Sequence, residues 1–309
     1  MKPEILVTVQ IEDARLASFR EAFIVHHGVW PDLETIATLG GDASAVYTNG
    51  TVGLSGAAMD VLPQLKIIAA QGAGTENIDL ASAKRRGIAV TNGAGTNSSC
   101  VADHAMALLL SLVREIPTID RLSRTGEWAS LRTNRPAISN KRLGIVGFGR
   151  VGQLIAKRAT GFDLSVSYHS RRPVADSPLR HVSDLIQLAE RSDFLVLACP
   201  GGPATRHIVN AAVLEALGPS GYLVNVARGS VVDTQALIEA VEGNRIAGAA
   251  LDVYEDEPGV PRSLWHMPNL VLTPHLAGSA PEVRDEQIAL ALRNITAFFE
   301  GNPLVNEIT

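Results

Sequence analysis

Arg228, Glu257 and His275 each follow a short apolar run in the second half of the sequence. The carboxyl ends of strands in an open α/β sheet are where ligands bind. Reduction of a carbonyl next to a carboxylate requires three groups: a guanidinium that binds the carboxylate, an imidazole that donates a proton, and an acid that orients and charges the imidazole. Each residue taken alone has an ordinary alternative. Arg228 could belong to a surface ion pair, Glu257 could be a solvated acid, and His275 could be a histidine of the core. Together they predict one catalytic site.

A glycine motif lies upstream of these residues. It reads Gly-Phe-Gly-Arg-Val-Gly, follows an apolar run and opens a helical pattern. In that context the first glycine makes a tight turn, the second lets the backbone approach a pyrophosphate, and the third lets the helix pack on the strand. The alternative is a glycine-rich turn without a ligand. We predict a dinucleotide site made by Gly147, Phe148, Gly149, Arg150, Val151 and Gly152.

The next strand end indicates which dinucleotide binds. An NAD site carries Asp or Glu about 20 residues after the motif, whereas this sequence has Ser170, Arg171 and Arg172 there. A guanidinium holds a ribose 2′-phosphate that an acid would repel. We therefore predict NADPH, with NADH as a weaker alternative. The competing interpretation is that the two arginines form a solvated basic turn.

The surrounding elements alternate between short apolar runs and amphipathic stretches, which is typical of parallel sheets covered by helices. A long helical pattern over 98–114 separates two such series, and the second matches a complete doubly wound sheet. The predicted strands cover 5–9, 43–48, 66–70, 88–91, 143–147, 164–168, 194–198, 222–226, 246–251 and 270–272. The predicted helices cover 13–25, 80–86, 98–114, 151–160, 183–191, 211–217, 234–242 and 281–300.

This order predicts two doubly wound α/β domains. The helix over 281–300 comes after the second sheet is complete, so we expect the chain to cross back and place it on the first domain. A Rossmann cofactor domain, 100–278, would then be inserted into a flavodoxin-like substrate domain made of 1–99 and 279–309. The length of 309 residues fits two domains of roughly 150 residues each.

Composition excludes several classes of protein. The net charge is −5, and no segment concentrates the basic residues as a nucleic-acid-binding surface would. The longest apolar stretch, 105–113, is shorter than the roughly 20 residues that span a bilayer. We predict no metal site, because no spacing of histidines and acids fits one. Two isolated cysteines, Cys100 and Cys199, and no signal peptide pattern predict a cytoplasmic location.

These motifs together resemble those of the D-2-hydroxyacid dehydrogenase family over nearly the whole chain. The resemblance is greatest to NADPH-dependent glyoxylate/hydroxypyruvate reductases and their hydroxyphenylpyruvate-reducing relatives, because of Ser170-Arg171 and the segment 217–219. The motifs that carry the resemblance are 72–79, 86–92, 101–104, 147–152, 225–229, Asp252-Val253, Glu257-Pro258 and 273–275.

The resemblance implies a role for each site residue. Arg228 would hold the substrate carboxylate and carbonyl, His275 would be the acid/base, and Glu257 would pair with His275. The backbone at Ala73 and Gly74 would hold the carboxylate from the other domain. Asp252 would contact the nicotinamide carboxamide. The other implied cofactor contacts are Cys199, Pro200, Thr205, Val226, Ala227, His275, Ala277 and Gly278.

The resemblance also implies a reaction and an assembly. We expect NADPH-dependent reduction of small 2-oxo acids such as glyoxylate and hydroxypyruvate to D-2-hydroxy acids, in a homodimer formed by the cofactor domains. The segment 126–131 resembles a region that can reach a neighbouring subunit's site. Two alternatives are a reductase for a bulkier 2-oxo acid such as hydroxyphenylpyruvate and a nucleotide-sensing scaffold like the co-repressors of this superfamily. His104, on the apolar helix, we interpret as structural.

Overall fold

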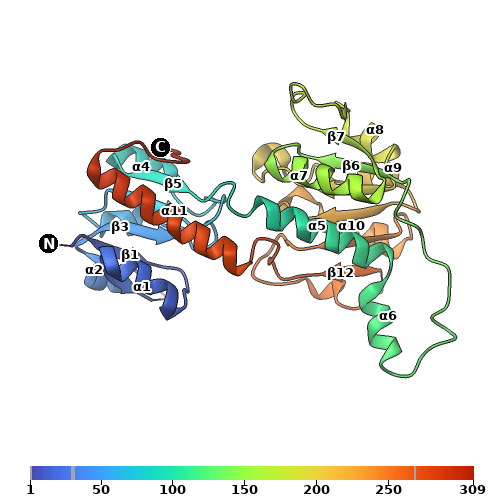
Figure 1. The fold of residues 1–309 in the computed structure, drawn as a ribbon, viewed down its shortest axis with the longest axis horizontal. Helices are drawn as coiled ribbons and strands as arrows, with labels where there is room; N and C mark the ends of the chain where they lie inside the picture. Colours follow the sequence, from blue (N-terminus) through green and yellow to red (C-terminus); the bar gives the residue numbers. More distant parts are fainter. Residues whose placement is uncertain (1, 29–31, 268) are drawn as a thin grey trace. The chain divides into compact units, whose positions relative to one another are not determined.

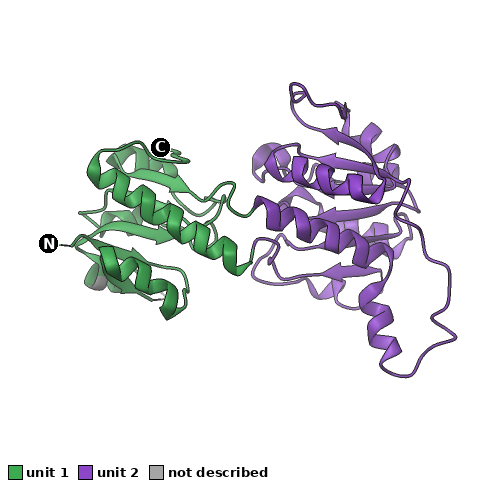
Figure 2. Cartoon of the chain, viewed as in Figure 1, with its two compact units in different colours: residues 1–97, 279–309 green, residues 98–278 purple. Residues whose placement is uncertain are grey.

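The computed structural model describes residues 2–28, 32–267 and 269–309. The chain divides into two compact units, which Figure 2 colours separately. Unit 1 consists of 1–97 and 279–309, and unit 2 of 98–278. Each unit contains one parallel sheet with its own helices, so the predicted α/β class with two parallel-sheet domains is confirmed.

Unit 1 contains a five-stranded parallel sheet in the order β2-β1-β3-β4-β5. This is the flavodoxin-like strand order. One core contains buried side chains of α1, α11 and the sheet, and the other lies under α3 and α4. The elements are β1 (Glu4–Val7), α1 (Asp13–Ala22), β2 (Ile24–His27), α2 (Leu33–Gly40), β3 (Ala43–Thr48), α3 (Gly56–Asp60), β4 (Ile67–Ala70), α4 (Leu80–Arg86), β5 (Ala89–Asn92) and α11 (Pro281–Glu300).

The predicted helix over 13–25 is wrong at its end. Helix α1 stops at Ala22, and the next residues form the edge strand β2, parallel to β1. Ile24 and Val25 are β-branched, which favours an extended backbone. Their apolar side chains happen to fit the helical spacing of the apolar residues before them, which is why the predicted helix was too long. Ile24 is exposed at the edge of the sheet.

Unit 2 contains a seven-stranded parallel sheet in the order β12-β11-β10-β9-β6-β7-β8, whose direction of winding changes between β6 and β9. Ligands bind at such a switch point, outside the carboxyl ends of the strands. The elements are α5 (Ser98–Val113), α6 (Ile116–Ser123), β6 (Arg142–Val146), α7 (Arg150–Ala159), η1 (Thr160–Phe162), β7 (Ser165–His169), β8 (Arg180–His181), α8 (Leu185–Glu190), β9 (Phe194–Leu197), η2 (Pro203–Thr205), α9 (Ala211–Leu217), β10 (Tyr222–Asn225), η3 (Gly229–Val231), α10 (Thr234–Glu242), β11 (Gly248–Leu251), η4 (Arg262–Leu264) and β12 (Leu270–Leu272).

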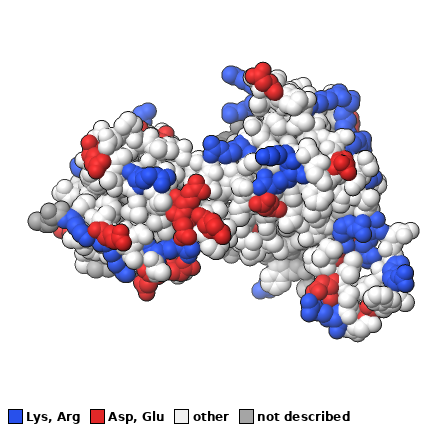
Figure 3. All heavy atoms as spheres, in the orientation of Figure 1, with Lys and Arg blue, Asp and Glu red and all other residues white. Residues whose placement is uncertain are grey.

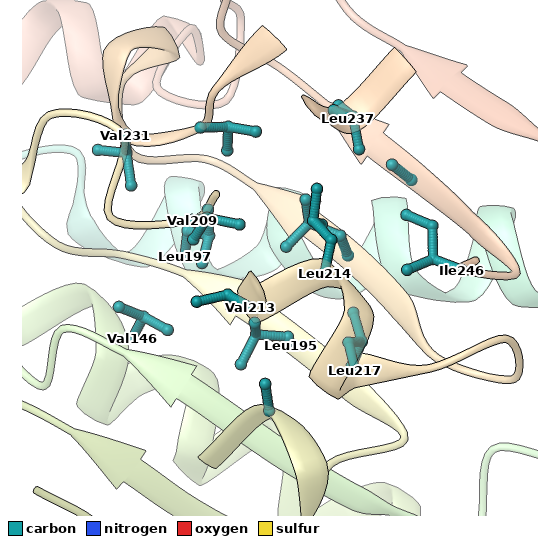
Figure 4. Close-up of a cluster of buried hydrophobic side chains, with 14 of the residues drawn as sticks. Val146, Leu195, Leu197, Val209, Val213, Leu214, Leu217, Val231, Leu237 and Ile246 are labelled. Carbon is teal, nitrogen blue, oxygen red and sulfur yellow. The ribbon is translucent and has the colours of Figure 1, made fainter. Parts of the chain in front are cut away.

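Two apolar cores hold the sheet of unit 2 between its helices. Helices α5 and α7 contribute to one core, and α8, α9 and α10 to the other. Figure 4 shows the second core, where Val213 of α9 lies beside Leu195 of β9, and Val209 lies beside Leu197. Because both faces are covered, the strands β9, β10, β11 and β12 carry almost only apolar residues, whereas β7 and β8, at one side of the sheet, also include polar ones. A polar side chain within these strands therefore needs a specific partner.

The segment between α5 and β6 differs from the rest of unit 2. None of the predicted elements covers this segment, but it includes α6, none of whose residues is buried. This helix and the chain that follows extend away from the sheet (Figure 1). Two large apolar side chains, Ile116 and Trp128, are 53% and 74% exposed.

The molecular surface carries both signs of charge. On the face drawn in Figure 3, acidic and basic side chains occur on both units. Within 2–28, 32–267 and 269–309, no helix is long and apolar enough to cross a membrane.

Candidate active site

The glycine motif connects β6 to α7 through a turn that admits no side chain at two positions. Gly147 has a φ of +91°, and a Cβ atom there would lie 2.5 Å from the Cα atom of Cys199. A Cβ atom at Gly152 would lie 2.2 Å from the carbonyl oxygen of Gly147. The first glycine therefore permits the turn, and the third permits close packing of the helix.

The middle glycine, Gly149, differs from the other two because the space around it is open. Gly149 is the N-cap of α7, it makes no side-chain cap, and a Cβ atom there would meet nothing within 4 Å. No side chain of the described residues caps the N-terminus of α7, so the positive end of the helix dipole remains suited to an anion there. These features fit the pyrophosphate of a dinucleotide.

The predicted phosphate-binding residues lie beside this turn. Strand β7 pairs with β6 so that Val146 is opposite His169, which brings Ser170 to the carboxyl edge of the sheet. The Ser170 hydroxyl donates to the carbonyl oxygen of Arg172 at 2.6 Å. Arg171 and Arg172 are exposed, and neither guanidinium has a hydrogen-bond or ion-pair partner in the described part of the chain. The arrangement is compatible with both interpretations of the two arginines, so NADPH preference stays a prediction.

The remaining predicted cofactor residues follow β9, β10 and β12. Cys199, Pro200 and Thr205 come after β9, and the Thr205 hydroxyl donates to the carbonyl oxygen of Pro200 at 2.8 Å. Burial raises the pKa of the Cys199 thiol to about 11, so the thiol is protonated at neutral pH. Val226 and Ala227 follow β10, and Ala277 and Gly278 follow β12. Their contacts with a cofactor stay predictions.

His275 and Glu257 are in direct contact. The Nδ1 atom of His275 lies 2.6 Å from Oε2 of Glu257, and Oε1 of the same carboxylate accepts a hydrogen bond from the N–H of Tyr254 at 3.0 Å. The side chains of His275 and Glu257 are 43% and 24% exposed. Because Nδ1 faces the carboxylate, Nε2 is the nitrogen left for a substrate.

Asp252 organises the loop that carries His275. The Asp252 side chain is 1% exposed. Its Oδ1 atom accepts hydrogen bonds from the Thr273 hydroxyl at 2.6 Å and from the N–H of Leu276 at 3.0 Å. Its Oδ2 atom accepts one from the N–H of Ala277 at 2.9 Å. The backbone carbonyl of Asp252 accepts from the N–H of His275 at 2.8 Å. These bonds surround a His275 backbone with a φ of +50°, which side chains rarely adopt.

The charge of Asp252 is stabilised within the protein. Burial by itself would raise the pKa of its carboxyl group, but the hydrogen bonds that it accepts outweigh burial and hold the pKa below its ordinary value. The group is therefore ionised at neutral pH and acts only as an acceptor. The contact of Asp252 with the nicotinamide carboxamide stays a prediction.

Arg228 follows β10, two strands from His275 in the same sheet. Buried Asn225 shapes its loop: the side-chain amide donates to the carbonyl of Arg228 at 3.1 Å and accepts from the N–H of Ala227 at 3.0 Å. A Cβ atom at Gly201 would lie 2.8 Å from Cγ of Arg228, so the arginine stem lies over this glycine. Because β10, β11 and β12 are neighbours, Arg228, Glu257 and His275 all follow strands at one edge of the sheet.

The sequence analysis assigned no role to several residues that shape this edge, although the motifs 225–229 and 273–275 include two of them. Asn225 and Thr273 hold the loops of Arg228 and His275, and the Tyr254 hydroxyl donates to the carbonyl oxygen of Thr273 at 3.0 Å. His104, interpreted as structural, lies 3.1 Å from the Thr273 hydroxyl through its Nε2 atom. The available signal was a polar residue at the end of an otherwise apolar strand.

The predicted carboxylate-binding loop belongs to unit 1. Asn92 donates through its side chain to the carbonyl of Ala73 at 2.8 Å, and Gly93 N–H donates to the carbonyl of Gly72 at 2.9 Å. The N–H groups of Ala73 and Gly74 have no protein acceptor among the described residues. They are suited to binding an anion, and their contact with a substrate stays a prediction.

Comparison with known proteins assigns the family. The NAD binding domain of the D-isomer specific 2-hydroxyacid dehydrogenases matches residues 106–277. A glyoxylate/hydroxypyruvate reductase of Arabidopsis thaliana is 41% identical over 268 residues, 86% of this chain and 83% of the relative. A hydroxyphenylpyruvate reductase of Plectranthus scutellarioides is 38% identical over 268 residues, 85% of each chain.

A solved structure is also similar over the full length. It is the NADPH-dependent glyoxylate/hydroxypyruvate reductase of Sinorhizobium meliloti in complex with NADP and malonate, with a TM-score of 0.91, 34% identity, and coverage of 100% of this chain and 97% of that chain. The fold and site thus define an NAD(P)-dependent oxidoreductase. The chain belongs to the D-isomer specific 2-hydroxyacid dehydrogenase family, and the family resemblance seen in the sequence is confirmed.

Proposed function

We propose that this protein reduces small 2-oxo acids, such as glyoxylate and hydroxypyruvate, to D-2-hydroxy acids with NADPH. The observation that carries the proposal is the pair formed by His275 and Glu257 at the sheet edge that also bears Arg228. The named reductases among the relatives support the substrate class.

The residues divide the reaction between binding and proton transfer. NADPH supplies the hydride when bound. Arg228 holds the substrate carboxylate through two donors of its guanidinium. Nε2 of His275 donates a proton to the carbonyl oxygen as that oxygen becomes negative. Glu257 accepts a hydrogen bond from Nδ1–H of His275, which fixes the orientation of the imidazole and leaves Nε2 for the substrate.

The cofactor proposal rests on two separate features. The uncapped first turn of α7 would hold the pyrophosphate, and the exposed guanidinium of Arg171 would hold the ribose 2′-phosphate. Ser170 would add a hydroxyl beside it. Binding of NADP to the Sinorhizobium meliloti reductase supports this choice.

We also propose that the protein acts as a homodimer. Helix α6 and the chain after it leave Ile116 and Trp128 exposed, although side chains of this size are usually covered. A second copy of the chain would cover them. Light scattering on the purified protein should give twice the monomer mass, and Trp128→Ser should shift the equilibrium towards the monomer.

A substrate comparison tests the function directly. NADPH oxidation is followed with glyoxylate, hydroxypyruvate, pyruvate and hydroxyphenylpyruvate, and each reaction is repeated with NADH. We expect the highest kcat/KM with glyoxylate or hydroxypyruvate, and with NADPH. A preference for hydroxyphenylpyruvate would support the second candidate, which the Plectranthus scutellarioides relative favours. Binding of NADPH without turnover of any acid would overturn both and favour a nucleotide-sensing scaffold.

A further inference from the structure

His104 connects a helix on one face of the unit 2 sheet to the loop of His275. Helix α5, which carries His104, packs against β10, β11 and β12. The side chain of His104 is 18% exposed, and its Nε2 atom lies 3.1 Å from Oγ1 of Thr273 and 3.5 Å from Oδ1 of Asp252. A histidine that only filled space in an apolar face would not need two polar partners.

The direction of these hydrogen bonds follows from the number of protons available. Asp252 is ionised and accepts only. The single hydroxyl proton of Thr273 is used in the 2.6 Å bond to Asp252. The Thr273 oxygen must therefore accept from His104, so Nε2 of His104 carries a proton. His104 therefore donates a hydrogen bond to Thr273, and Thr273 donates one to Asp252.

This chain of donors ends on the loop that presents His275. Asp252 binds the N–H groups of Leu276 and Ala277 through its carboxylate, and that of His275 through its carbonyl. His275 has a left-handed backbone, a conformation that persists only where the surroundings hold it. Loss of a donor at His104 would leave the Thr273 oxygen with one partner fewer and reduce the constraint on the loop.

We propose that His104 is a positioning residue for catalysis, which acts through Thr273 and Asp252 to hold the loop of His275 in place. The inference rests on the proposed role of His275 as proton donor. Catalysis depends strongly on the placement of a reacting group, so that a displacement of about 1 Å can cost about a hundredfold in rate. The effect of His104 should therefore appear in kcat and much less in the binding of either substrate.

Three variants test the donor. His104→Leu removes the N–H and keeps an apolar side chain in the face of the helix, and we expect kcat to fall about ten- to a hundredfold, with KM for the 2-oxo acid and for the cofactor nearly unchanged. His104→Gln keeps an N–H donor and should restore most of kcat. Thr273→Val removes the intermediate hydroxyl and should lower kcat as His104→Leu does. The double variant should lose little more than either alone, because both act in one network.

The controls separate positioning from general destabilisation. Leu109→Ala, in the same helix and fully buried, should lower Tm and leave kcat at 25 °C unchanged. Crystal structures of His104→Leu and wild type give a readout that needs no turnover: the φ of His275 or the position of its ring should change in the variant.

The outcomes distinguish this inference from the proposed function. If wild type reduces a 2-oxo acid and His275→Ala abolishes the reaction, the function stands; an unchanged kcat in His104→Leu, or equal losses in His104→Leu and His104→Gln, then overturns the inference alone. Wild type that reduces no 2-oxo acid overturns the proposed function, and an unmoved His275 in the crystal of His104→Leu overturns the inference independently.

Discussion

The two halves of the unit 2 sheet edge are built in different ways. At the ends of β6 and β7 the structure presents glycines, free backbone N–H groups and two exposed arginines without protein partners in the described chain. At the ends of β10 to β12, the side chains of Asn225, Asp252 and Glu257 make hydrogen bonds to the backbone of the loops that follow these strands. The first half offers donors to groups supplied from outside, whereas in the second half hydrogen bonds within the protein hold the loops that carry Arg228 and His275.

The contrast reflects two physical tasks. A dinucleotide brings its own negative charges, so the cofactor half needs only donors and space. Proton transfer depends on the placement of one imidazole, so the catalytic half needs a rigid support. Variants in the two halves should therefore fail in different ways.

The largest expected effect is the loss of the proton donor. His275→Ala should lower kcat/KM for 2-oxo acid reduction by about 10²- to 10⁴-fold. Glu257→Gln keeps a side chain of the same size and removes the charge, so it should cause a smaller loss. Both variants should bind NADPH as wild type does in a fluorescence titration. If these variants lost NADPH affinity as strongly as they lost activity, the catalytic half would also contribute to cofactor binding.

The glycine motif offers a second contrast, within the cofactor half. Gly147→Ala places a methyl group 2.5 Å from the Cα atom of Cys199 in a backbone with positive φ. We expect a loss of about 2 kcal/mol or more in the free energy of unfolding, since the left-handed backbone alone costs roughly 1–2 kcal/mol. Gly149→Ala meets no protein atom and should leave Tm unchanged, but its methyl group would occupy the space expected for the pyrophosphate. Calorimetry and a cofactor titration on both variants test this; a lower Tm in Gly149→Ala would contradict it.

The same contrast explains what the sequence predicts well. Apart from the end of the first helix, the predicted elements agree with the structure to within two residues at each boundary. Apolar periodicity is a local signal, and so is a glycine motif between a strand and a helix. The residues of the cofactor half could therefore be predicted from one continuous stretch of the sequence.

The missed features depend on distant partners or on very weak patterns. Strand β8 has two residues, and the sequence predicted a six-stranded sheet without it. The exposed helix α6 has no buried face to produce a strong pattern. Thr273 and His104 are separated by 169 positions, and only the fold brings them together. Nothing local distinguishes such a histidine from one that merely packs in a helix face.

A third prediction concerns specificity in the cofactor half. Arg171→Ala should weaken NADPH binding by about ten- to a hundredfold, because one hydrogen bond to a charged group contributes about 1.5–3 kcal/mol. NADH lacks the 2′-phosphate, so its affinity should change little. Arg172→Ala is the matched control next to it. Equal losses for NADPH and NADH in Arg171→Ala would favour the interpretation of these arginines as a solvated basic turn.

The smallest effect expected is a dependence of stability on pH that arises in the catalytic half alone. Glu255 binds Nε2 of His207 at 2.6 Å through one carboxylate oxygen and the hydroxyl of Thr234 at 2.6 Å through the other. Burial opposes ionisation, but the bonds from His207 and Thr234 outweigh it and lower the pKa of Glu255. A carboxyl group whose pKa is lower in the folded state stabilises that state above its unfolded pKa, about 4.3, and the contribution is lost as the pH falls through the folded value.

Glu255→Gln should therefore lower Tm at pH 7 and lose its effect in acid. The expected cost at pH 7 is about 1 kcal/mol, typical of hydrogen bonds at a partly exposed site. The difference in Tm between wild type and variant, measured by calorimetry from pH 7 to pH 3, should begin to shrink below about pH 4.3, where the carboxyl group of the unfolded state becomes protonated. It should vanish once the pH is low enough to protonate the folded-state carboxyl group as well. Ser170→Ala, in the cofactor half, should show a difference that is constant with pH, because a hydroxyl does not titrate there. A constant difference for Glu255→Gln as well would mean that the hydrogen bonds of Glu255 stabilise the fold equally whether or not its carboxyl group is ionised, which would contradict this prediction.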